Sequence, residues 1–258
     1  MRTVAEIRKA LQNADEEQYE VLSRALVADE RKGVKSALAA ARKRLDAQAA
    51  EALRLESMYA TASALAGGGL AMGLDEVGRG PVAGPLTVAA VVLPDAPRIE
   101  GLNDSKQVAP AARTRMAESI KACALAWDIE FIEPHDIDAY GMSACLRTAF
   151  GQAIAAIDEQ LSGVAAVLLD GNPLHIDPRE RNIIKGDAKC APIAAASIIA
   201  KVERDALMCE YAKEYPQYGF DSNKGYGSAD HIEAIRTYGL TPVHRASFCH
   251  AWAQESLF

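Results

Sequence analysis

The chain has 258 residues, half of them apolar, and a formal net charge of −7. This length allows one large domain or one domain with an appendage, and the apolar half is enough for a substantial core. No run of about 18 uncharged apolar residues is present, and residues 1–6 lack the apolar core of a signal peptide, so we expect no membrane span and no secretion. The five cysteines are scattered without a C-x-x-C pair, which disfavours a disulfide framework or a zinc site and fits a reducing cytoplasm.

The charge is distributed unevenly along the chain. Residues 1–57 carry a formal charge of +1 and the remainder carries −8. An acidic main domain is not expected to coat a nucleic acid by neutralising its phosphates with lysine and arginine. It is compatible with a phosphate-handling site whose positive charge comes from bound metal ions.

The first 65 residues have the periodicity and composition of helices. Apolar stripes around Ile7 and Tyr19 predict two short helices, and Gly33 is expected to end or interrupt the second. A long helix rich in Ala, Arg, Leu and Glu is predicted over 34–59, and the three glycines at 67–69 give the best linker signal in the chain. We therefore expect a helical appendage over 1–66, a linker over 67–69, a catalytic domain over 70–213 and a helical carboxyl-terminal region over 214–258.

A cluster of basic residues lies in this helical appendage, and two interpretations of it are open. The cluster contacts the phosphate backbone of a nucleic acid, or it is a solvated helix face that nearby acids balance. The second is favoured because glutamates and aspartates are interspersed with it. The cluster comprises Arg31, Lys32, Lys35, Arg42, Lys43 and Arg44.

Apolar runs and amphipathic stretches alternate from Leu70 onward. The run over 70–74 predicts a buried strand that ends in acids, and the run over 86–93 predicts its partner strand after a turn rich in Gly and Pro. An antiparallel pair followed by strand–helix crossovers indicates an α/β fold with a mixed sheet covered by helices. Further strands are predicted over 123–132 and 164–169, and helices over 110–122, 143–161 and 194–213.

Acidic residues follow these predicted strands. Asp75 and Glu76 end the first, Asp170 ends the strand over 164–169, and Asp187 follows a short segment later. Open α/β sheets bind ligands at the carboxyl ends of their strands, so these acids are expected to meet at one edge. Consecutive strand residues point to opposite faces, so Asp75 and Glu76 reach one site only where the strand ends, or one of them binds through its backbone carbonyl.

Four clustered carboxylates repel one another strongly. Divalent cations relieve this repulsion, and an all-oxygen ligand set favours magnesium or manganese over zinc. Two such ions about 4 Å apart can hold the attacking and leaving oxygens of a phosphoryl displacement. The five histidines show no H-x-x-x-H pattern, which argues against a zinc hydrolase.

Candidate phosphate contacts accompany the acids. Lys106 and Lys185 are basic residues in loops near the acids, and the bare backbone over 78–80 can approach a sugar or phosphate closely. The small residues before Ser197 are expected to expose a helix amino terminus, which binds anions. Lys201 lies one turn after Ser197, and together with an acid a further turn on it is more typical of an ordinary helical ion pair than of chemistry.

Seven short motifs occur in order between Leu70 and Phe248. They are Asp75–Pro81, Asp104–Lys106, Leu169–Gly171, Lys185–Asp187, Ala195–Asp205, Gly225–Gly227 and His244–Phe248. This ordered set resembles the bacterial ribonuclease HII family and is far more specific than any single motif. The helices before Leu70 lie outside it, so the resemblance implies nothing about their role.

The resemblance implies a ribonuclease H-like fold and an endonuclease that acts on RNA in a duplex with DNA. Its hallmark substrate is a single ribonucleotide embedded in DNA, cut on the 5′ side to leave a 3′-hydroxyl. The implied cofactors are two Mg²⁺ or Mn²⁺ ions. By the family pattern these ions are held by Asp75, Glu76, Asp170 and Asp187.

The resemblance also implies substrate contacts. Gly78, Arg79 and Gly80 would contact the 2′-hydroxyl, the group that separates RNA from DNA. Tyr226 would stack on the next sugar and sense the RNA-to-DNA junction, although a surface aromatic is the alternative for this residue. The implied phosphate contacts are Ser105, Lys106 and Ser197. Three motif residues are interpreted as structural: Asp205, and His244 with Arg245, which would tie the carboxyl-terminal loop to the core.

The last five residues resemble the short peptide by which bacterial replication and repair proteins dock on the sliding clamp. Gln254, Leu257 and Phe258 would be the contacts, because a few apolar anchors carry the energy of groove binding. The alternative is that Leu257 and Phe258 pack on the protein's own core.

Two other functions are compatible with parts of the sequence. A catalytically silent nucleic-acid-binding or clamp-associated protein on the same fold is disfavoured, because binding alone needs no repulsive set of four acids. A dinucleotide loop over 78–84 is disfavoured because its glycine spacing differs from G-x-G-x-x-G. We expect a monomeric cytoplasmic enzyme whose partners are RNA/DNA hybrids, ribonucleotide-containing duplex DNA and the clamp, with no membrane association.

Overall fold

The computed structural model describes residues 2–252. The chain forms two compact units, Met1–Glu56 and Ser57–Phe258. Three helices precede the sheet: α1 (Val4–Asn13), α2 (Glu16–Ala25) and α3 (Lys32–Leu65). Within the described residues no helix is long and apolar enough to cross a membrane.

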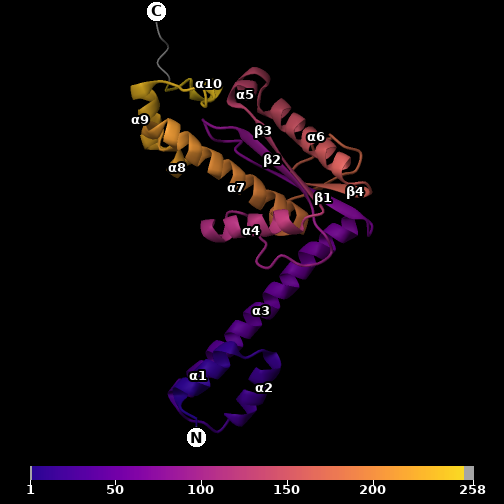
Figure 1. Cartoon of the computed structure of the whole chain (residues 1–258), viewed down its shortest axis with the longest axis vertical. Helices are drawn as coiled ribbons and strands as arrows, with labels where there is room; N and C mark the ends of the chain where they lie inside the picture. Colours follow the sequence, from indigo (N-terminus) through magenta and orange to yellow (C-terminus); the bar gives the residue numbers. More distant parts are fainter. Residues whose placement is uncertain (1, 253–258) are drawn as a thin grey trace, which may run out of the picture. The chain divides into compact units, whose positions relative to one another are not determined.

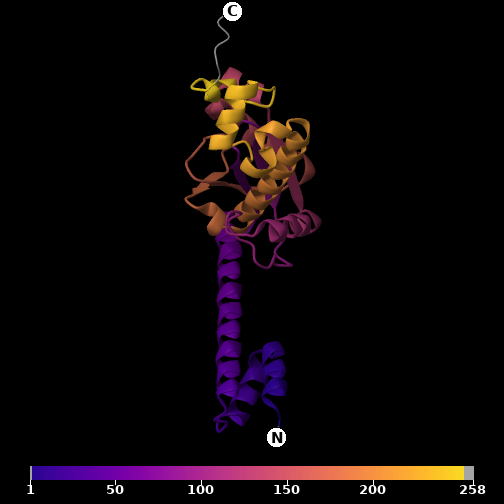
Figure 2. The same cartoon turned by 90° about the vertical axis from the view of Figure 1, so that its left-hand side faces the viewer.

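The amino-terminal unit is a small helical assembly with its own apolar core, in which α1 and α2 lie beside the first turns of α3 (Figure 2). Thr3 and Asp15 cap α1 and α2 in reciprocal capping boxes, which satisfy exposed amide groups at each helix start. The core comprises Ile7, Leu11, Val34, Ala37 and Ala41, with partly buried neighbours around it.

Gly33 has a different role from the expected one. It does not end the second helix, which stops at Ala25, but lies in the first turn of α3. A Cβ at Gly33 would lie 2.7 Å from Cγ1 of Val4. The glycine is therefore explained by the close approach of the segment carrying Val4 to α3, which any side chain would oppose.

The basic cluster of this unit is largely engaged in internal contacts. Arg31 bonds to Asp29, Lys35 to Glu30, and Arg42 to both Glu16 and Asp46, while Arg44 donates to the carbonyls of Leu11 and Ala14. These contacts agree with the interpretation of a solvated helix face balanced by acids, which the sequence favoured.

The second unit contains a five-stranded mixed sheet in the order β3-β2-β1-β4-β5 (Figure 1). β1 is central, antiparallel to β2 and parallel to β4, and the outer pairs are β2–β3 antiparallel and β4–β5 parallel. The predicted mixed sheet is confirmed. The strands are β1 (Leu70–Val77), β2 (Leu86–Val92), β3 (Ala126–Ile132), β4 (Val164–Asp170) and β5 (Glu180–Ile183).

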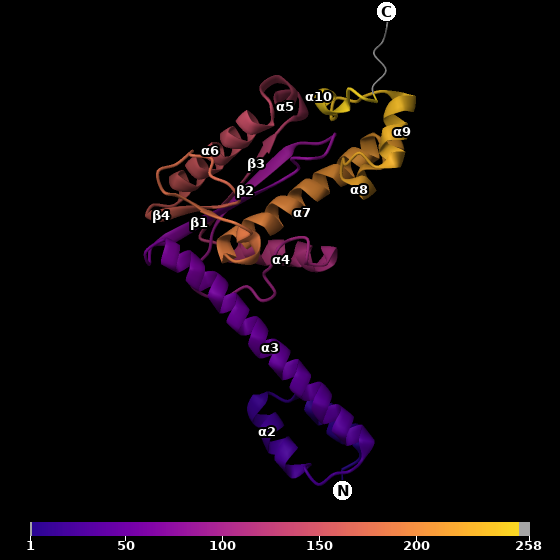
Figure 3. The same ribbon diagram turned by 180° about the vertical axis from the view of Figure 1, so that it is seen from behind.

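Helices cover both faces of this sheet. α6 packs on one face, against β2 and β3, and α7 packs on the other against β1 and β2, with α4 beside it (Figures 1 and 3). The remaining helices are short or lie near the carboxyl terminus. The helices are α4 (Pro110–Cys123), α5 (Pro134–Tyr140), α6 (Met142–Gln160), α7 (Ala191–Glu214), α8 (Phe220–Asn223), α9 (Ala229–Tyr238) and α10 (Ala246–Cys249), with 3₁₀ turns η1 (Gly186–Ala188) and η2 (Pro216–Tyr218).

The contact between β1 and α7 is exceptionally close. A Cβ at Gly73 would lie 2.2 Å from the backbone carbon of Pro192 and 2.3 Å from the backbone nitrogen of Ile193. Only a glycine in the central strand lets the first turn of α7 lie directly on the sheet. Residues 191–200 of α7 are all buried as a result.

The start of α7 corrects one sequence-based expectation. The small residues before Ser197 do not expose a helix amino terminus there, because α7 begins at Ala191, with Pro192 in its first turn. Ser197 therefore lies inside the helix and is buried. The Ala-rich run forms the part of α7 that fits against the sheet.

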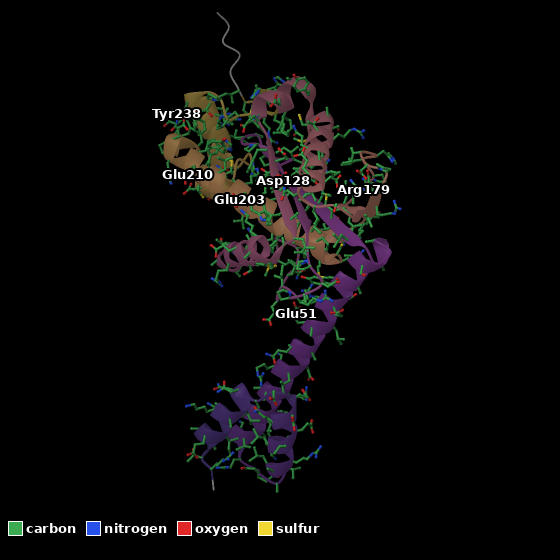
Figure 4. All side chains as sticks on the ribbon, turned by 45° about the vertical axis from the view of Figure 1, so that its right-hand side comes forward. Glu51, Asp128, Arg179, Glu203, Glu210 and Tyr238 are labelled. Carbon is green, nitrogen blue, oxygen red and sulfur yellow. The ribbon has the colours of Figure 1, made fainter. Side chains whose placement is uncertain are left out.

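Side-chain contacts connect the helices to one another and to the segment before β5 (Figure 4). Arg179, labelled in Figure 4, donates to Asp158 of α6 and to Asp177, which fixes the approach to β5. On the opposite face Lys121 of α4 pairs with Glu203 of α7, also labelled. All five cysteines are free thiols.

Candidate active site

The strand acids are brought together by the register of the two parallel strands. Leu74 of β1 pairs with Leu169 of β4, so Asp75 and Asp170 follow at the same level on neighbouring strands. Oδ1 of Asp170 accepts a hydrogen bond of 2.6 Å from the amide of Gly186. That bond holds turn η1, which carries Asp187, against the end of β4.

The sequence predicted that the first strand ends at the acids. β1 instead continues through them to Val77. Asp75 therefore lies on the same face as Gly73, toward α7, and Glu76 lies on the opposite face. Asp75 is only 8% exposed, and it receives a hydrogen bond of 2.8 Å from the amide of Glu76 and one from the hydroxyl of Ser197. Oε1 of Glu76 lies 3.2 Å from Nη1 of Arg79.

The electrostatics show that the four acids act on one another. Burial, followed by Glu76 and Asp170, raises the pKa of Asp75 well above its usual value. Burial also raises the pKa of Glu76, and Asp170 adds to this while Arg79 opposes it. The pKa of Asp187 is raised by burial, by Asp104 and by Asp170. Perturbed carboxyls of this kind, gathered at one end of a sheet, are typical of a functional site.

Three of the four acids nevertheless have separate local partners. Asp75 is held by its neighbour's amide and Ser197, Glu76 by Arg79, and Asp170 by the amide of Gly186. Within residues 2–252, no three His, Cys, Asp or Glu side chains converge tightly enough to hold a metal ion.

The raised pKa of Asp75 makes the stability of the metal-free protein depend on pH. An aspartate in an unfolded chain has a pKa of about 3.9. Because the folded pKa is higher, the stabilising contribution is complete below a pH of about 4 and is lost as the pH rises through the folded value. In EDTA at pH 7 we expect Asp75→Asn to be more stable than the parent chain, because asparagine places no charge in this buried position.

Urea unfolding in EDTA, repeated at several pH values, checks this. The difference should disappear as the pH falls below about 4, where the aspartate becomes protonated in both states. Asp95→Asn is the matched control, because Asp95 is exposed in a loop and should leave stability unchanged. A gain in Asp75→Asn that is absent at pH 7, or that is the same at every pH, contradicts the prediction.

We call residues 78–85, which connect β1 to β2, the glycine turn. Two fully buried arginines contact it from inside the protein, Arg204 of α7 and Arg245 just before α10. Both donate to backbone carbonyls of the turn. Burial lowers the pKa of each arginine to about 10, and their mutual repulsion contributes for Arg245, so both remain charged at neutral pH.

A second loop, carrying Tyr226, packs on the glycine turn. The carbonyl of Gly225 accepts hydrogen bonds from the amides of Val82 and Ala83, at 2.9 and 3.2 Å. Gly225 has φ of +84°, and a Cβ there would lie 2.2 Å from the carbonyl oxygen of Ala83, so no other residue fits without strain. Tyr226 is half exposed, and its ring lies beside Gly80. The predicted contacts with the ribose and with the next sugar are therefore neighbours.

A buried histidine pair supports Tyr226. Nδ1 of His244 accepts from the amide of Thr241 at 3.0 Å, so its proton lies on Nε2, which donates to Nε2 of His231 at 3.1 Å. Nδ1 of His231 then donates to the carbonyl of Tyr226 at 2.8 Å. Burial lowers the pKa of both histidines, to about 4 for His244, which keeps this one-directional chain neutral.

The predicted phosphate contacts divide into two groups. The hydroxyls of Ser105 and Ser197 lie 3.0 Å apart, and the charge of Lys106 reaches Asp187, so these three residues adjoin the acids. Lys185 is exposed in a left-handed conformation two residues before Asp187. Their contacts with substrate remain predictions.

Sequence reasoning missed some residues of this site. Asp104 lies close enough to Asp187 to raise its pKa, and it folds its own loop by accepting from the amide of Lys106. Arg204 and His231 were not singled out, because nothing in a sequence shows which arginine or histidine is buried. The expectation for His244 and Arg245 is confirmed, since both bind the loops around the glycine turn. Asp205 is paired with Lys201, in agreement with a structural role.

Comparison with known proteins agrees with this geometry. The family model for ribonuclease HII matches residues 72–251, and the model for the ribonuclease HII N-terminal domain matches residues 3–65. Ribonuclease HII of Clostridium acetobutylicum is 41% identical over 249 residues, covering 94% of this chain and 96% of that protein.

The chain belongs to the ribonuclease HII family.

Solved structures support the assignment. This ribonuclease is similar to the crystal structure of ribonuclease H2 from Pyrococcus horikoshii, with a TM-score of 0.58 and 25% identity over 70% of this chain and 96% of that one. A ribonuclease HII from Archaeoglobus fulgidus, solved in a complex with PCNA, has a TM-score of 0.59 and 25% identity over 68% of this chain and 93% of that one. The protein is therefore a ribonuclease H-type hydrolase, and its amino-terminal helices belong to the family's own N-terminal domain.

Proposed function

We propose that this ribonuclease is an endonuclease that cuts RNA in RNA/DNA hybrids and cuts duplex DNA on the 5′ side of a single embedded ribonucleotide. The products would carry a 3′-hydroxyl and a 5′-phosphate. The observation that carries the proposal is the position of the acids at the carboxyl ends of β1 and β4, beside the glycine turn and Tyr226. Such an activity would serve ribonucleotide excision repair and primer removal.

The proposed metal ligands are carboxylates only. Oxygen ligands of this kind suit Mg²⁺ or Mn²⁺, and the mutual repulsion seen in their raised pKa values is what a cation would relieve. A ribonuclease HIII, 20% identical and alike in fold, has been solved in complex with Mn²⁺. Two bound ions would supply charge stabilisation to the phosphoryl displacement. The ligands would be Asp75, Glu76, Asp170 and Asp187.

The remaining residues of the site would orient the substrate. The glycine turn, through residues 78–80, would contact the ribose 2′-hydroxyl, and the exposed ring of Tyr226 would stack on the next sugar. Ser105, Lys106 and Ser197 lie beside the acids and would hold phosphates, with Lys185 as a further basic contact. The acids would then act on a phosphate whose sugar has already been identified as ribose.

Cleavage of defined duplexes tests this proposal. A duplex with one ribonucleotide, incubated with Mg²⁺ or Mn²⁺, should give a single cut on the 5′ side of that ribonucleotide. The same duplex made entirely of DNA should remain intact, and so should the ribonucleotide duplex in EDTA. Cleavage of the all-DNA duplex would contradict the proposal. So would a ribonucleotide duplex that stays intact with Mg²⁺ and also with Mn²⁺.

We also propose that the carboxyl-terminal peptide docks on the sliding clamp. Gln254, Leu257 and Phe258 lie outside the described residues, so the support comes from their sequence pattern and from the archaeal ribonuclease HII solved with PCNA. Deleting residues 254–258 should remove clamp binding and leave cleavage of a free duplex unchanged. The matched control replaces Glu255, between the proposed contacts, with Ala. Clamp affinity that survives the deletion rejects this proposal.

The free cysteines support a reducing compartment, and we propose that the enzyme acts in the cytoplasm as a monomer.

A further inference from the structure

The glycine turn directs several carbonyl groups onto one buried guanidinium. Arg245 donates to the carbonyls of Gly78, Arg79, Pro81 and, twice, Gly84, at 2.6 to 3.1 Å. An arginine has five N–H donors, so every donor of Arg245 is used by backbone oxygens of this turn. The side chain is fully buried, and among the two arginines that support the turn only Arg245 contacts the carbonyls of Gly78 and Arg79.

The direction of these carbonyls fixes the direction of the amides that follow them. A trans peptide unit is planar, and its C=O and N–H point in opposite directions. Because the carbonyls of Gly78 and Arg79 point toward Arg245, the amides of Arg79 and Gly80 point away from it. Arg79 and Gly80 are exposed, and no group among residues 2–252 accepts a hydrogen bond from either amide.

The residues that carry these two amides lie beside other proposed contacts of the site. The side chain of Arg79 bonds to Glu76, and a Cβ at Gly80 would lie 3.8 Å from Cε1 of Tyr226. Arg79 and Gly80 are therefore flanked by a proposed metal ligand and by the ring proposed to stack on the next sugar. A hydroxyl oxygen placed there can accept both bonds, whereas the C–H of a deoxyribose cannot.

We propose that Arg245 is a positioning residue for ribose recognition, which holds the carbonyls of Gly78 and Arg79 inward so that the next two amides donate to the 2′-hydroxyl. The inference rests on the proposed function, in which the glycine turn contacts the ribonucleotide. It adds that the selectivity for ribose depends on a buried side chain that never touches the substrate.

Arg204 provides a matched control for this role. It is equally buried, and it donates to the carbonyls of Pro85, Ala83 and Lys224 at 2.9 to 3.0 Å. None of these carbonyls precedes the amides of Arg79 or Gly80. Replacing Arg204 with Lys should therefore weaken the same region without changing the direction of those two donors.

The experiment compares binding to two duplexes of one sequence, which differ in a single ribonucleotide or its deoxyribonucleotide. Arg245→Lys and Arg204→Lys are each made in the full-length Asp170→Asn chain, so that bound duplexes stay intact. We expect Arg245→Lys to reduce the preference for the ribonucleotide duplex by roughly 5- to 100-fold, the value of two lost hydrogen bonds. Affinity for the all-DNA duplex should stay near that of the Asp170→Asn chain, and Arg204→Lys should keep the preference.

The outcomes separate this inference from the function on which it rests. An unchanged preference in folded Arg245→Lys overturns it, and so does an equal loss in Arg204→Lys, since any loosening of the turn would then suffice. If the Asp170→Asn chain shows no preference for the ribonucleotide duplex before either arginine is replaced, the proposed function itself fails, and the inference fails with it. Should Arg245→Lys not fold, Arg245→Ala with added guanidinium ion replaces it. A preference that returns with guanidinium supports the inference, and one that does not return overturns it.

Discussion

Asp170→Asn is expected to lower the rate of cleavage at a single ribonucleotide by roughly 10³-fold or more, since a metal ion supplies several kcal/mol of charge stabilisation. Asp170 is the acid at the centre of the site, because its charge reaches Asp75, Glu76 and Asp187 alike. Its replacement therefore removes the proposed ligand that interacts with all three of the other acids. The rate is best measured with enzyme in excess over a labelled duplex.

The substitution is also conservative for the fold. Oδ1 of Asp170 accepts from the amide of Gly186 at 2.6 Å, and the carbonyl oxygen of an asparagine can accept the same bond. Turn η1 should thus keep its place, and duplex binding should persist. Exposed Asp95, replaced with Asn, is the control for charge alone and should retain full activity. Cleavage by Asp170→Asn within about tenfold of the parent rate would show that this carboxylate is not a metal ligand.

Gly73→Ala is expected to destabilise the protein by about 3 kcal/mol or more, at or above the upper end of ordinary overpacking effects. The new methyl group would meet backbone atoms of Pro192 and Ile193 rather than the end of a flexible side chain. The sheet and α7 would have to separate, and Ser197, which bonds to Asp75 from α7, would move with the helix. Urea unfolding measures the loss.

Gly151→Ala is the matched control for this prediction. Gly151 lies inside α6, and a Cβ there would meet nothing within 4 Å. Exchanging a helix-interior glycine for alanine should stabilise the chain by about 1 kcal/mol. If Gly73→Ala lowers the free energy of unfolding and Gly151→Ala raises it, the loss at Gly73 comes from its close packing and not from the exchange of glycine for alanine as such. If Gly73→Ala were as stable as the parent, the close contact between β1 and α7 would be wrong.

Much of the fold could be predicted because strands and amphipathic helices leave patterns among residues that are close in the sequence. Apolar runs bounded by glycine marked the strands, and the register of Leu146, Phe150, Ile154 and Ile157 placed α6, where all four are buried. The acids were found because each follows an apolar run. Their shared location follows from the parallel pairing of β1 with β4, a relation that the alternation of strands and helices already indicates.

The parts that could not be predicted depend on contacts between distant segments. An alanine-rich run gives no clear helix start, so the helix was predicted to begin at residue 194 whereas α7 begins at Ala191. The anion site predicted before Ser197 was wrong for this reason. The short helix α5 was missed because a proline and a glycine bound only seven residues. Gly33 looked like a helix end because its true reason, the nearness of Val4, is tertiary. The supporting arginines were invisible for the same reason.

The strand order gives the proposed metal ligands unequal freedom. β1 lies at the centre of the sheet, and its pairing with β2 continues through both acids, Asp75 opposite Ala89 and Glu76 opposite Val88, so both stand on a paired strand. Asp187 stands on a 3₁₀ turn beyond a four-residue edge strand. Accommodation of a proposed ion should therefore come from the turn that carries Asp187, while the central strand serves as a fixed reference for the proposed cations and the scissile phosphate.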